Sequence, residues 1–153
     1  MKQVHVECLP DELLVSKLGF RAKSITHHTG KSRVFHVLSK NENQLAIVDE
    51  DPGSPKTSYE KSLKLLEEFE GISYFVDKSG NKVFILKGKL EDWTIRLCKQ
   101  HKIKLSNFNL PEKPNDLHGV IHLRLSNFAD LLDVLLRKNN PGILKLKTWL
   151  RQE

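Results

Sequence analysis

Apolar residues in the first half of the chain follow the period of a strand and the period of a helix in turn. Short apolar or alternating runs bounded by turn residues predict strands over residues 3–8, 23–28 and 44–49. Apolar residues at helical spacing predict helices over residues 11–20, 31–40 and 57–69. A strand followed by a helix, three times in succession, is typical of a parallel sheet with helices on its faces.

Residues 57–69, TSYEKSLKLLEEF, carry the clearest of these helix signals. Thr57 or Ser58 can cap the start, and Glu60 stands at the spacing of a capping box. The sequence therefore predicts one helix over the whole segment.

The second half of the chain is predicted to add a hairpin and further helices. Two β-rich runs within residues 72–88 flank a Lys-Ser-Gly-Asn turn and predict a hairpin or a pair of short strands. Helical patterns occupy residues 90–102, 126–138 and 142–151. Residues 104–119 contain two prolines and no periodicity, which predicts a loop or linker.

These elements predict an α/β fold, with a Rossmann-like, mostly parallel sheet, helices on both faces and a C-terminal helical extension. We expect residues 1–103 to form the α/β domain. Residues 104–153 are expected to be a linker and helices that pack on the same domain. A chain of 153 residues is long enough to bury a core as a single domain.

The charge of the chain favours a polyanionic partner. Its 25 lysines and arginines exceed its 19 acids, for a net charge of +6, and neutralised phosphates would release counterions. Simple solubility is the alternative explanation. No apolar run approaches the roughly 20 residues that span a membrane. The N-terminus lacks a signal-peptide pattern, and Cys8 and Cys98 form neither a disulfide framework nor a C-x-x-C pair, so we expect a cytoplasmic protein.

Acidic residues follow two of the predicted strands. The stretch AIVDEDPGS places Asp49, Glu50 and Asp51 at the end of an apolar run, and Glu7 ends the first strand. Because the carboxyl ends of parallel strands share one edge of a sheet, these acids are expected to meet there. If the strand geometry persists, Asp49 and Asp51 point the same way and Glu50 points elsewhere. Asp11 begins the predicted helix that follows Glu7. Oxygen ligands of this kind suit Mg²⁺ or Mn²⁺.

Each acid also has a purely structural explanation. Asp11 can be a helix cap, and the acids before Pro52 and Gly53 can be a solvated turn. The joint pattern, rather than any single residue, favours a metal site.

The segments VHVECLPDELLVSKLGF and LAIVDEDPGS together resemble the Toprim domain. Topoisomerases, bacterial primases, recombination proteins, and OLD-type and small ribosomal-RNA-processing nucleases share this domain, and the resemblance covers residues 3–90. It implies a Toprim-like fold in which Glu7 is the catalytic or metal-binding glutamate. Asp49 and Asp51 would be metal ligands, and Asp11 stands where several members place a further acid. Cys8 departs from the family, which commonly has Gly there.

The resemblance implies a Mg²⁺- or Mn²⁺-dependent nuclease acting on DNA or RNA phosphodiesters. OLD-type nucleases carry a further acidic position, for which the candidate metal ligand here is Glu91. Its structural alternative is an acid in the first turn of a helix. Basic residues near the predicted strand ends and turns are candidates for nucleic-acid contacts, with solubility as the alternative; they are Lys31, Arg33, Lys56 and Lys89.

Two other classes of function stay open. A non-catalytic Toprim-like module would bind nucleic acid or a partner protein, and Cys8 favours this alternative. A phosphotransfer or small-phosphoester enzyme would use the same acids. OLD-type Toprim domains are usually joined to an ATPase. This chain lacks the phosphate loop of an ATPase, because Ile25 stands where the loop would need Gly. A separate ATPase partner is therefore a further expectation. The leucine-rich C-terminal helices are expected to pack on the sheet, with a homodimer surface as the alternative.

Overall fold

The computed structural model describes residues 2–152 and contains a six-stranded sheet with the strand order β2-β1-β3-β6-β5-β4. The strands are β1 (Val4–Val6), β2 (Ile25–His27), β3 (Leu45–Asp49), β4 (Lys64–Phe69), β5 (Ile72–Val76) and β6 (Lys82–Leu86). The first four in spatial order are parallel, whereas β5 and β4 are antiparallel additions at one side. The predicted α/β class with a mostly parallel sheet is therefore confirmed.

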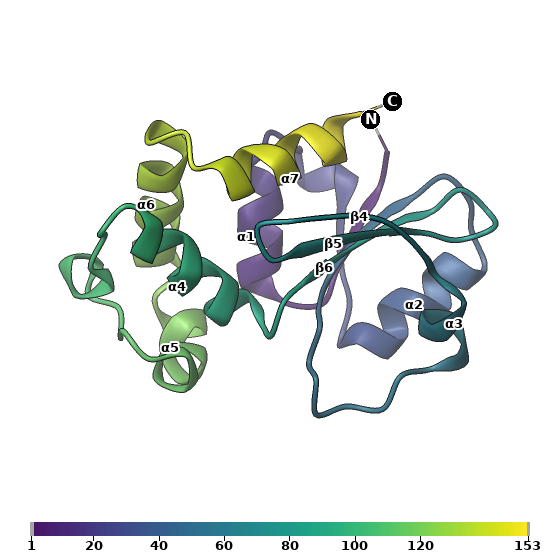
Figure 1. Ribbon diagram of the computed structural model, residues 1–153, viewed down its shortest axis with the longest axis horizontal. Helices are drawn as coiled ribbons and strands as arrows, with labels where there is room; N and C mark the ends of the chain where they lie inside the picture. Colours follow the sequence, from purple (N-terminus) through teal and green to yellow (C-terminus); the bar gives the residue numbers. More distant parts are fainter. Residues whose placement is uncertain (1, 153) are drawn as a thin grey trace.

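Helices cover both faces of this sheet (Figure 1). The helices are α1 (Leu9–Lys17), α2 (Lys31–Ser39), α3 (Ser58–Ser62), α4 (Leu90–Gln100), α5 (Pro114–Val120), α6 (Leu125–Arg137) and α7 (Pro141–Arg151). Side chains of α1, α4, α6 and α7 share the larger apolar core with one face of the strands, and those of α2 and α3 pack in a smaller core on the other. Alternating strand residues supply the two cores, as the period of a strand requires.

The central strand β3 shows why these residues form strands. Its apolar run Leu45 to Val48 is wholly buried, with β1 on one side and β6 on the other. Leu45 and Ile47 face the larger core, and Ala46 and Val48 face the smaller one. A strand buried on both faces needs a continuous apolar run, which is what the sequence has here.

The predicted helix over residues 57–69 is wrong in its second half. Thr57 does cap a helix by accepting a hydrogen bond from the backbone N–H of Glu60 (3.2 Å), but the helix ends at Ser62. Residues 64–69 instead form β4, which pairs with β5 through a tight turn at Glu70 and Gly71, both with positive φ (48° and 76°). Pairing with a strand later in the chain overrides a local helix preference, because β-structure depends on its partner.

The predicted loop over residues 104–119 is also wrong. It contains a 3₁₀ turn, Leu105–Phe108, and the helix α5, with a second 3₁₀ turn, Ile121–Leu123, directly after it. Pro114 occupies the first turn of α5, where its missing N–H has no helical partner to lose. A proline that suggested a loop thus begins a helix. Leu117 on this helix is fully buried in the larger core.

The turn between β4 and β5 makes a test of the corrected fold. Gly71→Ala puts a Cβ at a positive φ, 3.0 Å from Arg96 Nη1 and 3.2 Å from Trp93 Cδ1. We expect it to lower the free energy of unfolding, measured by urea denaturation, by about 1–2 kcal/mol. The control is Gly53→Ala, where an added Cβ meets no atom within 4 Å. Equal effects of the two substitutions would contradict the hairpin.

Candidate metal centre

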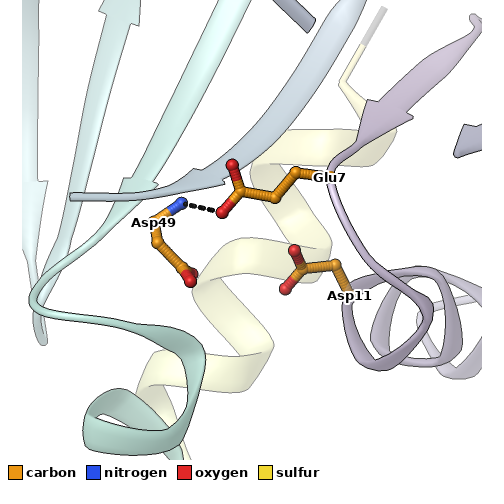
Figure 2. A group of neighbouring side chains, drawn as sticks. All are labelled: Glu7, Asp11 and Asp49. Carbon is orange, nitrogen blue, oxygen red and sulfur yellow. Dashed lines mark hydrogen bonds between the residues drawn. The ribbon is translucent and has the colours of Figure 1, made fainter. Parts of the chain in front are cut away.

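Three carboxylates converge at the carboxyl ends of β1 and β3. Glu7 follows β1, Asp49 is the last residue of β3, and Asp11 lies in the first turn of α1. One carboxylate oxygen of each lies within 4.8 Å of the others. Figure 2 shows the three side chains approaching one space from the two strand ends and the helix. Among residues 2–152, they are the one group of three or more acids, histidines or cysteines close enough to share a metal ion.

The parallel pairing of β1 with β3 brings Glu7 and Asp49 together. Val6 pairs with Ile47 in this register, so β1 and β3 end at the same edge of the sheet. The backbone N–H of Asp49 donates to Oε1 of Glu7 (3.2 Å), and the backbone N–H of Leu90 donates to Oδ1 of Asp49 (3.0 Å). These two bonds fix the carboxylates and leave their other oxygens free for a ligand.

Asp11 is the most unusual member of the group. Its side chain is fully buried, and it makes no capping bond at the start of α1. The thiol of Cys8 donates to Oδ2 of Asp11 (3.1 Å), while Oδ1 has no hydrogen-bond partner in the described part of the chain. A buried carboxylate without a partner is costly, so this position is poorly explained as a cap. A cation at the three acids would compensate for it.

The cluster resists ionisation in the absence of a cation. Burial, with the neighbouring acids, raises the pKa of Asp11 to about 8 and that of Asp49 to about 9. Burial also raises the pKa of Glu7, although the N–H of Asp49 and the charge of Lys31 oppose this shift. At neutral pH the cluster therefore holds protons, which a bound divalent cation would displace.

Asp51 does not join the three acids. The strand ends at Asp49, and Asp51 has a positive φ (47°), so the two side chains do not continue the alternation of a strand. The carboxylate of Asp51 accepts a hydrogen bond from the hydroxyl of Ser54 (2.6 Å), and Asp51 lines a pocket that Glu7 and Asp49 also line. The side chain of Glu50 accepts from the backbone N–H of Gly88 (3.0 Å).

Glu91 is a buried acid at the start of α4 that also lies outside the group of three. Only 5% of it is exposed, and its Oε1 lies 2.8 Å from Nδ1 of His118 on α5. Its Oε2 has no partner within residues 2–152. Both residues line a pocket of about 300 Å³ that Glu7 and Asp49 also line.

Sequence reasoning missed His118, and with it His122, which lines the same pocket. The reason is the incorrect loop prediction, since a histidine in an unstructured linker has no predictable neighbours. The available signal was a proline at the first turn of a helix, followed by two histidines four residues apart.

Two of the four predicted basic residues reach the pocket. Lys31 lies in its wall, where Nζ donates to the backbone oxygen of Glu50 (2.9 Å) and pairs with Glu60 (3.4 Å). Lys89 lines the pocket just before α4. Arg33 and Lys56 are exposed and do not line this pocket.

Comparison with known proteins identifies no relative: no protein-family model, no curated protein and no solved structure matches the chain. The Toprim resemblance therefore stays a prediction. No helix within the described residues is long and apolar enough to cross a membrane.

The raised pKa values predict how the stability of the metal-free protein depends on pH. In the folded state Asp11 keeps its proton up to about pH 8 and Asp49 up to about pH 9. In the unfolded chain both lose their protons above about pH 4. The stability they contribute is thus complete below pH 4 and is lost as pH rises to 9. Thermal unfolding in a metal chelator should show a melting temperature that falls from pH 5 to pH 9.

The matched control is Asp49→Asn, which keeps an oxygen acceptor for Leu90 but cannot ionise. Its melting temperature should fall less steeply over the same range. Parallel slopes for the two proteins would show that Asp49 ionises as freely in the folded protein as in the unfolded chain.

Proposed function

We propose that the protein is a Mg²⁺- or Mn²⁺-dependent nuclease that hydrolyses phosphodiesters of DNA or RNA. The observation that carries the proposal is the convergence of Glu7, Asp49 and the fully buried, partly unpartnered Asp11 at one edge of the sheet. All three supply carboxylate oxygens, the donors that hard divalent cations prefer. The donor set thus fits magnesium or manganese better than zinc.

The roles of the protein's own residues follow from their positions. The three acids would hold the cation, and the backbone N–H groups of Asp49 and Leu90 would keep two of them oriented. When bound, the cation activates the attacking oxygen and stabilises charge at the phosphate. Lys31 and Lys89, in the wall of the pocket, would place the phosphate next to the acids.

The charge of the chain supports a nucleic acid rather than a small ester as the substrate. A net charge of +6 attracts a polyanion through counterion release. The pocket, at about 300 Å³, has room for one phosphate and its neighbouring groups. Free thiols at Cys8 and Cys98 support a reducing compartment, and we propose the cytoplasm.

A second candidate function is a non-catalytic module that binds nucleic acid or a partner protein such as an ATPase. The observation that favours it is the Cys8 thiol, which occupies one oxygen of Asp11 (3.1 Å) and so competes with a cation. Metal binding without cutting would select this candidate.

The test of the nuclease is metal titration calorimetry together with cutting of labelled single- and double-stranded DNA and RNA. For Asp49→Asn we expect the affinity for Mg²⁺ to fall by more than about 100-fold, because even changes outside the ligand shell cost 10- to 100-fold. Metal-dependent cutting should be lost with it.

Asp130→Asn is the control, because Asp130 is exposed on α6, away from the pocket. It should bind and cut like the wild type. A wild-type protein that binds no Mg²⁺ or Mn²⁺ at millimolar concentration would rule out the proposed function.

A further inference from the structure

The acid–imidazole pair Glu91–His118 has no part in holding the cation as described above. Glu91 is 5% exposed and lies in the wall of the pocket, and its only protein partner within residues 2–152 is Nδ1 of His118 (2.8 Å). A carboxylate buried to this degree needs a compensating group. The imidazole supplies it, and the imidazole is itself in the pocket.

The position of His118 suits proton transfer. Its side chain is 53% exposed, so it reaches solvent and the pocket while Nδ1 contacts the buried Glu91. When Nδ1–H donates to a carboxylate, the lone pair of a neutral imidazole is on Nε2. The hydrogen bond to Glu91 therefore selects the tautomer that can accept a proton on its solvent side.

We propose that His118 is a catalytic residue that serves as the general base of the site, with Glu91 as its positioning residue. The inference rests on the proposed phosphodiesterase function. Nε2 takes a proton from the attacking water, and the water oxygen forms a bond to phosphorus. The bond from phosphorus to the leaving oxygen breaks, and that oxygen keeps the electron pair and takes a proton from solvent. Glu91 stabilises the imidazolium that results, as a buried carboxylate does beside a catalytic histidine.

Two other groups in the pocket are weaker bases for this step. One oxygen of Glu7 accepts a hydrogen bond from the N–H of Asp49, and the proposed function assigns its other oxygen to the cation, so Glu7 is not available as the base. His122 lines the same pocket, but among residues 2–152 no carboxylate lies within ion-pair distance of it. His122 is therefore the natural control for His118.

The experiment compares cutting by the wild type, His118→Asn, His118→Ala and His122→Asn with Mg²⁺ and labelled DNA and RNA. Asn keeps an N–H donor for Glu91 but cannot take a proton. We expect His118→Asn to lower kcat by about 100- to 10⁴-fold, with KM and Mg²⁺ affinity unchanged. His122→Asn should lower kcat far less than His118→Asn does.

Added imidazole distinguishes a base from a structural residue. The space left in His118→Ala opens to solvent, so free imidazole should restore cutting in that variant and leave His118→Asn unchanged. Wild-type kcat in His118→Asn, or a loss in His118→Ala that imidazole does not restore, would overturn the proposal while the nuclease stands. A wild type that cuts no substrate would overturn both.

Glu91→Gln separates positioning from metal binding. Glutamine keeps the size of Glu91 but does not fix one imidazole tautomer, so kcat should fall while the affinity for Mg²⁺ stays the same. A loss of Mg²⁺ affinity in this variant would make Glu91 a cation ligand and overturn its role as the partner of His118.

Discussion

Three carboxylates share one space where β1 and β3 end, and one of them, Asp11, has no access to water. Burial raises the pKa of all three, and repulsion from neighbouring acids adds to it, so folding alone does not stabilise their charged forms. A polar arrangement of this cost is expected where function requires it. The proposed cation site depends on this one constraint, and Glu91, His118 and the lysines Lys31 and Lys89 line the same pocket around it.

The fold brings the acids and His118 together from separate parts of the chain. Parallel pairing of β1 with β3 sets Glu7 beside Asp49, and the turn into α1 buries Asp11 below them. The start of α4 adds a backbone N–H to Asp49 and places Glu91, and α5 covers Glu91 with His118. The α5 region is therefore part of the site and shares the larger core with the sheet.

The sequence predicts the sheet and its acidic edge because both depend on local patterns: apolar period, turn residues and acids at strand ends. Prediction from sequence fails where contacts with a distant segment of the chain determine the local structure. Residues 64–69 have the pattern of a helix but pair with β5, and α5 packs where the prolines suggested a linker. Asp51 was expected to point the same way as Asp49, but the strand stops two residues earlier, so Asp51 lies in the wall of the pocket and outside the group of three acids. The burial of Asp11 and its contact with Cys8 depend on packing that no local pattern records.

The most direct test of the account is a crystal structure of the protein soaked with Mn²⁺, read from its anomalous difference map. The account predicts a peak among the carboxylates of Glu7, Asp11 and Asp49, with Oδ1 of Asp11 turned toward it. A map without a peak there, at a Mn²⁺ concentration that saturates known magnesium enzymes, would contradict the claim that these buried acids exist to hold a cation.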